Sequence, residues 1–136
     1  MPCIEIYTNI LDEKVPDDFH PDLTKYFCDL LDKWPRAVVV SIYPNQKISL
    51  GKNLKEECVV VQIYNAEAFL DANDNKQFIK NVTDKLAATL KIKKERISIM
   101  LLSLTSHTVV TPWGLLADWD EFKWRFKYLD NLKTEN

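Results

Sequence analysis

Glycine and histidine are scarce in this sequence. Its 136 residues include two glycines, Gly51 and Gly114, and two histidines, His20 and His107. A G-x-G-x-x-G turn or a phosphate-binding P-loop needs closely spaced glycines, so both nucleotide motifs are excluded. Two histidines do not build a multi-histidine metal site. We therefore expect neither a metal ion nor an organic cofactor.

A long apolar run and an excess of basic residues are also absent. A helix needs about 20 consecutive apolar residues to cross a bilayer, and no uninterrupted apolar stretch of this sequence is that long. The chain has 18 basic and 20 acidic residues, a formal net charge of −2, whereas nucleic-acid binders normally carry a basic excess. The hydrophobic content of 46% is typical of one globular domain. We therefore expect no nucleic-acid partner and no membrane association.

Cysteine is too sparse for a disulfide framework. Cys3, Cys28 and Cys58 are odd in number and widely spaced, which favours a reducing compartment. Residues 1–6 have neither a basic start nor a long apolar segment. The sequence therefore predicts no signal peptide and a cytoplasmic protein.

The pattern of residues 1–43 predicts a strand, a helix and a second strand. Residues 4–10 are rich in β-formers, and residues 15–18 combine a proline with two acids, which is typical of a helix start. Apolar side chains then recur every three or four residues: Phe19, Leu23, Phe27, Leu30 and Leu31. Pro35 ends this helix, and residues 37–43 form a β-branched strand.

Residues 58–104 repeat this order. Residues 58–64 and 97–104 predict strands, and Asn73 or Asp74 is placed to cap the helix between them. The apolar stripe of that helix consists of Phe78, Val82, Leu86 and Leu90. Each crossover is long enough to make its two strands parallel. We therefore expect an α/β fold: a duplicated βαβ unit with a four-stranded mixed sheet and two helices on one face.

The second face of this sheet needs a cover. The strands expected at 38–42, 59–63 and 99–102 are apolar on both faces, and we take them as the inner strands. Two helices cover one face only, so the other would expose a large apolar surface. Self-association is the preferred cover, and the C-terminal segment is the second candidate.

The character of the sequence changes after Gly114. Trp119, Phe122, Phe126 and Leu129 are spaced three, four and three apart, with charged residues between them. This spacing predicts an amphipathic helix over residues 115–132. Docking on the protein's own body is the favoured interpretation, with a partner-binding helix as the alternative; the mixed charge argues against a membrane. We expect two units: a domain at 1–114 and a helical extension at 115–136.

Pro2 directly follows Met1, so removal of Met1 would leave a secondary amine at the chain terminus. Further motifs follow in order: Thr8-Asn9, Val15-Pro16-Asp17-Asp18-Phe19, Leu23-Thr24, Lys33, Pro44, Gln46, Gly51, Glu57-Cys58, Asp74-Asn75 and Leu90-x-Ile92-x-x-Glu95-Arg96-Ile97. Their order and spacing over residues 1–106 resemble the family of macrophage migration inhibitory factor and D-dopachrome tautomerase. The chain looks like a divergent member with a C-terminal extension.

The resemblance implies a homotrimer of tautomerase-like subunits with active sites at their interfaces. It implies keto–enol tautomerisation of phenylpyruvate-like or dopachrome-like compounds without a cofactor, the substrate being a small aromatic keto acid. Pro2 would be the catalytic base, since a desolvated terminal amine is neutral near pH 7. Lys33 would hold the substrate's carboxylate or enolate oxygen; without the resemblance, a solvated lysine at a helix end is the simpler interpretation.

The rest of the expected pocket departs from the family's pattern. Asn65-Ala66-Glu67 replaces the family's Ser-Ile-Gly, whose backbone amide meets the substrate. Ser98 and Met100 stand where relatives often have an aromatic residue and an asparagine. The alternative function is therefore a catalytically weak or inactive cytokine-like protein of the same fold, which binds a protein receptor and is secreted without a signal peptide.

Overall fold

The computed structural model describes residues 1–112 and 114–118, and the predicted strands and helices of residues 1–104 are all present. The main elements are β1 (Cys3–Thr8), α1 (Phe19–Leu31), β2 (Val39–Tyr43), β3 (Val59–Ala66), α2 (Ala72–Leu90) and β4 (Ile97–Leu104). Two short strands follow, β5 (Val110–Thr111) and β6 (Gly114–Leu115). The described 3-10 turns are η1 (Asp12–Lys14), η2 (Pro35–Ala37), η3 (Lys94–Arg96), η4 (Ser106–Thr108) and η5 (Leu116–Asp118).

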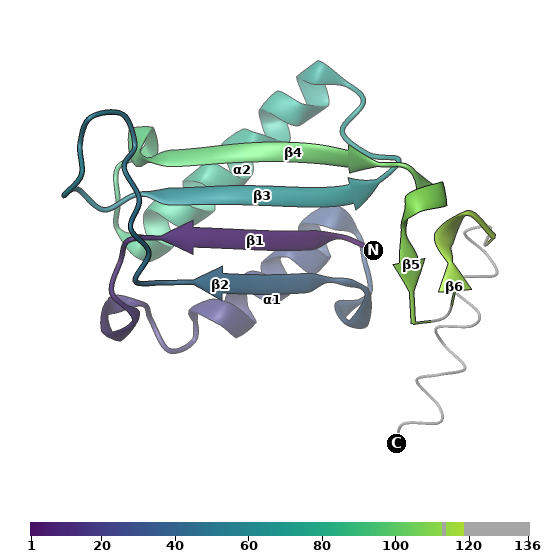
Figure 1. Cartoon of the computed structure of the whole chain (residues 1–136), viewed down its shortest axis with the longest axis horizontal. Helices are drawn as coiled ribbons and strands as arrows, with labels where there is room; N and C mark the ends of the chain where they lie inside the picture. The colour runs from purple at the N-terminus through teal and green to yellow at the C-terminus, as the bar shows by residue number, and fades with distance from the viewer. Residues whose placement is uncertain (113, 119–136) are drawn as a thin grey trace.

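The four long strands form one mixed sheet in the order β2-β1-β3-β4. β1 pairs with β2 in parallel, β3 pairs with β4 in parallel, and β1 pairs with β3 in antiparallel fashion. Both helices lie behind the same face of this sheet (Figure 1). This arrangement confirms the duplicated βαβ unit with two helices on one face.

The assignment of inner strands was wrong in part. β1 and β3 are central, whereas the segments taken as inner at 38–42 and 99–102 belong to the edge strands β2 and β4. The physical reason is that the two βαβ units join through their first strands. Ile6 of β1 lies opposite Val61 of β3, and both side chains are fully buried.

The core lies between the sheet and the two helices. Its largest fully buried side chains include Phe19, Phe27, Ile4, Ile6, Leu23, Ile63, Leu86, Val59, Val61 and Val82. Burial of one such side chain stabilises the fold by about 1.5–3 kcal/mol. Truncation of a buried phenylalanine such as Phe27 to alanine would cost about 3–5 kcal/mol.

The caps of the helices differ in detail from the prediction. α1 ends at Leu31, before Pro35, because Asp32 takes the left-handed conformation, with φ 51°, that terminates many helices. The N-cap of α2 is Asp71 and not Asn73 or Asp74. An N-cap side chain reaches the amide three residues later, and the Asp71 carboxylate accepts from the Asp74 amide at 2.8 Å.

The sheet face away from the helices is mixed and not uniformly apolar. Strand side chains alternate between faces, so the buried Ile4 and Ile6 place their neighbours on the open face: Cys3, Glu5, Tyr7, Val39, Ser41, Tyr43, Val60, Gln62, Tyr64, Ser98, Met100 and Leu102. Val39, Tyr43 and Met100 are 39%, 40% and 45% exposed. The rings of Tyr7 and Tyr43 stack with centroids 4.7 Å apart.

The helix predicted over residues 115–132 does not begin at residue 115: Leu115 pairs with Val110 in the β5–β6 hairpin, and Leu116–Asp118 form the 3-10 turn η5. The rest of the helix expected over residues 115–132, including Trp119, Phe122, Phe126 and Leu129, lies outside the described residues. Within the described residues, no helix has the length and apolar character needed to cross a membrane.

Candidate active site

One end of the sheet gathers segments that are distant in sequence. β1 and β2 begin there, β3 and β4 end there, and the β5–β6 hairpin lies beside them (Figure 1). A pocket of about 390 Å³ opens at this end. It is lined by Met1, Pro2, Lys33, Ala37, Asn65, Ala66, Glu67, Ser106, Leu116 and Ala117. The two predicted site residues, Pro2 and Lys33, therefore lie in one pocket of a single chain.

Pro2 is held by the first hydrogen bond of the parallel β1–β2 pair. Its carbonyl oxygen accepts from the Val39 amide at 2.9 Å, and the residue is buried. Met1 precedes it and is half-buried. Burial lowers the pKa of the Met1 amine below its usual 8.0, and the charge of Lys33 lowers it further. This end of the chain therefore favours a neutral amine.

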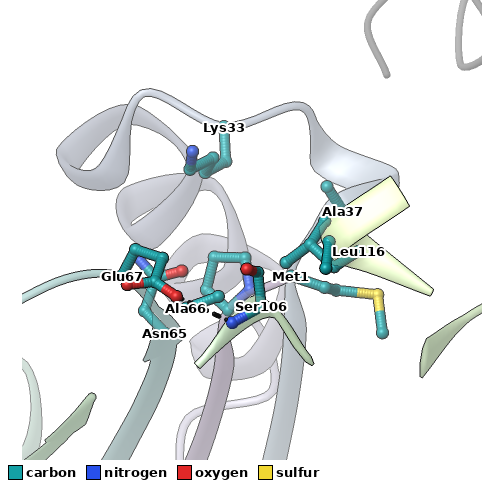
Figure 2. A pocket seen from close by; sticks show the side chains of 10 residues that line it. Met1, Lys33, Ala37, Asn65, Ala66, Glu67, Ser106 and Leu116 are labelled. Atoms are coloured by element: carbon teal, nitrogen blue, oxygen red, sulfur yellow. Dashed lines mark hydrogen bonds between the residues drawn. The ribbon is translucent and has the colours of Figure 1, made fainter. Parts of the chain in front are cut away.

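Lys33 is positioned by the way α1 ends. The left-handed Asp32 turns the chain, and the Lys33 amide donates to the Cys28 carbonyl at 2.9 Å. This bond closes the last helical turn and fixes the backbone from which the lysine side chain starts. In Figure 2 the Lys33 side chain lies above Asn65 and Glu67, at the rim of the pocket that it lines.

Asn65 is the pocket residue whose role the sequence did not indicate. It lies near the end of β3 and is 8% exposed. Its side-chain amide lines the pocket and makes no hydrogen bond with any residue that the structure describes. A ligand in the pocket that pairs with this amide in place of solvent gains about 0.5–1.5 kcal/mol. The signal in the sequence was its place in the altered Asn65-Ala66-Glu67 stretch.

The backbone of Glu67 has a conformation that glycine adopts more readily than other residues. Its φ of 50° lies in the left-handed region, which costs a non-glycine residue roughly 1–2 kcal/mol. Its amide donates to the Leu104 carbonyl at 2.8 Å, and its Oε1 accepts from the Ser106 amide at 2.8 Å. The Glu67 amide is therefore already paired and is not a donor for a ligand.

The pocket has a polar side and an apolar side. Figure 2 shows Lys33, Asn65 and Glu67 on one side, with Ala37 and Leu116 on the other. An anionic group can pair with Lys33 and Asn65 but is repelled by the Glu67 carboxylate, and an apolar group fits against Ala37 and Leu116. This division suits a small acid with an apolar substituent.

Ser98 and Met100 do not line this pocket in the single chain. Both lie on the open face of β4, opposite Val60 and Gln62. Among the described residues, no group of three or more histidine, cysteine, aspartate or glutamate side chains is placed to hold a metal ion.

The fold and the site define a class of protein: a duplicated βαβ subunit with a pocket at the N-terminal end of its first strand. The sequence profile described as macrophage migration inhibitory factor (MIF) matches residues 1–114, so the chain belongs to the macrophage migration inhibitory factor family. The resemblance stated from the sequence motifs is therefore confirmed.

Similar proteins agree with this assignment. Macrophage migration inhibitory factor of Xenopus laevis is 28% identical over 109 residues, which cover 80% of this chain and 93% of the frog protein. The homologue of Xenopus tropicalis is 26% identical over the same coverage.

Solved structures share the fold. The macrophage migration inhibitory factor of Oncomelania hupensis superimposes with a TM-score of 0.76 at 20% identity, covering 83% of this chain and 95% of that one. The Trichinella spiralis protein gives a TM-score of 0.74 at 23% identity, covering 81% and 96%. At these identities the structural likeness establishes the fold alone.

Proposed function

We propose that this family member is a cofactor-independent keto–enol tautomerase of small aromatic α-keto acids. The observation that carries the proposal is the amine environment at the start of β1. Burial and Lys33 both lower the pKa of the Met1 amine, one residue before Pro2, and the same pocket presents the lysine and the side-chain amide of Asn65. A neutral amine beside an anion-binding group is what proton abstraction next to a carbonyl requires.

The reaction follows from these groups. Removal of Met1 makes the Pro2 nitrogen the terminal secondary amine. This nitrogen takes a proton from C3 of the keto acid, the C2–C3 double bond forms, and the carbonyl electron pair moves to the C2 oxygen. The protonated Pro2 nitrogen then gives this proton to the C2 oxygen, directly or through water, which completes the enol and restores the neutral amine. Lys33 pairs with the carboxylate or the developing oxyanion, and the Asn65 amide donates a second hydrogen bond to the same acid.

The proposal includes a homotrimer as the working assembly. Its support is the family assignment and the open sheet face, where Val39, Tyr43 and Met100 are among the exposed large hydrophobic residues. A cytoplasmic location is supported by the three free cysteines, Cys28 and Cys58 among them, since free thiols fit a reducing compartment.

A receptor-binding, cytokine-like role is the second candidate. The observation that favours it is the pairing of the Glu67 amide with Leu104 at 2.8 Å, which removes one backbone donor from the altered Asn65-Ala66-Glu67 stretch. Without a free backbone donor at this position, the pocket would bind acids more weakly and turn them over slowly.

The deciding experiment measures turnover of phenylpyruvate and of dopachrome methyl ester by purified protein whose N-terminus has been sequenced. Protein that begins at Pro2 is expected to be active, and protein with an N-terminal tag is expected to be inactive, because the tag converts the amine into an amide. Lys33→Ala is expected to lower kcat/KM for the keto acid by roughly 10- to 100-fold. Equal turnover by tagged and processed protein would falsify the mechanism and favour the receptor-binding role.

A further inference from the structure

The apolar wall of the pocket includes residues beyond the part of the chain that matches the family. Leu116 and Ala117 line the pocket, whereas the family match ends at residue 114. In Figure 2 Leu116 lies next to Ala37, across the pocket from Glu67. Two residues of this wall, Leu116 and Ala117, therefore lie outside the matched part of the chain.

Two hydrogen bonds of Glu67 fix the chain that leads to this wall. The Glu67 amide donates to Leu104 and its Oε1 accepts from Ser106, each at 2.8 Å. The two bonds hold the chain on either side of Thr105, where it leaves β4 and enters η4. Figure 2 shows the bond between Glu67 and Ser106. Glu67 adopts a left-handed conformation with φ 50° while making both contacts.

Further hydrogen bonds tie Leu116 to the same segment. The Leu116 amide donates to the Val109 carbonyl at 2.8 Å. Between these two residues, the Thr111 hydroxyl donates to the Gly114 carbonyl at 3.0 Å and closes the turn from β5 to β6. The position of the Leu116 side chain therefore depends on the segment that Glu67 holds.

We propose that Leu116 is a specificity-determining residue that receives the apolar group of the substrate, and that Glu67 is the positioning residue that holds it there. The proposal rests on the proposed function for the class of substrate, an aromatic keto acid. With its carboxylate at Lys33 and Asn65, such an acid directs its ring to the opposite side of the pocket. Leu116 and Ala37 form that side.

The first test measures binding and does not depend on turnover. Calorimetry on the full chain compares 3-phenylpropanoate, a non-reacting acid with a ring, with propanoate, which lacks the ring. Leu116→Ala is expected to weaken the binding of 3-phenylpropanoate roughly fivefold and to leave the affinity for propanoate unchanged, because only the ring loses contact area. Leu54→Ala is the matched control, since Leu54 is 73% exposed and does not line the pocket. An unchanged affinity of Leu116→Ala for 3-phenylpropanoate would overturn the proposal.

The second test separates the hydrogen bond of Glu67 from its charge. Glu67→Gln keeps a side-chain oxygen for the Ser106 amide and is expected to bind 3-phenylpropanoate within roughly twofold of the parent. Glu67→Ala and Glu67→Gly lose that oxygen, and both are expected to bind 3-phenylpropanoate as weakly as Leu116→Ala does. The glycine variant is expected to do so even though glycine removes the backbone strain at this position. In the double variant Glu67→Ala/Leu116→Ala, no further loss is expected, since the two residues act on one contact.

Two results would contradict the role of Glu67. If Glu67→Gln binds as weakly as Glu67→Ala, the carboxylate acts through its charge and not as a holder of the segment. If Glu67→Gly binds like the parent, the hydrogen bond to Ser106 has no influence on the wall. Absence of turnover in the parent would refute the tautomerase proposal and leave these binding results interpretable.

Discussion

Lys33 and the amine of Met1 share one pocket, and the charge of the lysine lowers the pKa of the amine. The lysine therefore has two effects that separate experimentally. It attracts the carboxylate of a substrate, and it favours the neutral form of the terminal amine. The first effect appears in the affinity for acids and the second in the pH dependence of the reaction.

The pH profile of processed protein is the first prediction. A neutral amine is the active form, so kcat/KM is expected to rise with pH through one ionisation, and the burial and the Lys33 charge that lower the pKa of the Met1 amine are expected to lower that of the Pro2 amine in the same pocket. In Lys33→Ala the like charge is gone, the amine pKa increases, and the rise moves to higher pH. Kinetics over pH 5–10 measure both curves. An identical midpoint in the two proteins would show that Lys33 does not act on the Pro2 amine.

Arg96 provides a second prediction, on stability. Its side chain is 8% exposed and donates to the carbonyl oxygens of Leu50 at 3.0 Å, Glu56 at 2.7 Å and Glu57 at 3.3 Å. Arg96→Ala leaves these carbonyls unpaired and is expected to lower the free energy of unfolding by about 3 kcal/mol in urea titrations.

The control for Arg96 is Lys93→Ala. Lys93 pairs with the Glu56 carboxylate at 3.0 Å, and its side chain is 67% exposed. Little change in stability is expected, because exposed ion pairs are screened by solvent. Equal losses in the two variants would show that the carbonyl contacts of Arg96 are not what holds the segment from Leu50 to Glu57.

Periodicity predicted the helices and strands because side-chain burial repeats with them. Phe27 and Leu86 were placed on buried helix faces, and both are fully buried. The order of strands was not accessible in the same way. β2 is as apolar as a central strand, and only the pairing of Ile6 with Val61 shows which strands are inside.

The site was predictable only where residues match a motif. Pro2 and Lys33 were identified through the family resemblance, and the structure places them in one pocket. Asn65 and Leu116 were not predicted as site residues, because they come together only where the end of β3 meets the start of η5 at one edge of the fold. No local sequence signal describes such a meeting of distant segments.

Asp84 provides a third prediction, on acid stability. Its carboxylate accepts from Lys80 and Lys94 at 2.7 Å each, and these contacts lower its pKa from 3.8 to about 2. A carboxyl group with a depressed pKa stabilises the fold above the pKa of the unfolded chain, and this contribution is lost as pH falls from about 4 to about 2. Asp84→Asn is therefore expected to have a lower Tm than the parent at pH 7 and nearly the same Tm as the parent at pH 2.

The matched control is Asp29→Asn. Asp29 also accepts from a lysine four residues away, Lys25 at 3.1 Å, but its side chain is 70% exposed. Thermal unfolding at pH 7 and pH 2 is expected to show a pH-dependent difference for Asp84 and almost none for Asp29. The same pH dependence in both variants would indicate a general charge effect.

The last prediction concerns the open face of the sheet. If this face is covered by other copies of the chain, light scattering at micromolar concentration gives about three times the chain mass of 15.9 kDa. Met100, 45% exposed on β4, is central to the test, because a buried, unpaired carboxylate at this position would strongly disfavour association. Met100→Glu is expected to shift the mass toward the monomer. Leu70→Glu is the control, since Leu70 is 81% exposed and lies outside the sheet. A parent protein that scatters as a clean monomer would refute the trimer and leave the C-terminal extension as the remaining candidate to cover this face.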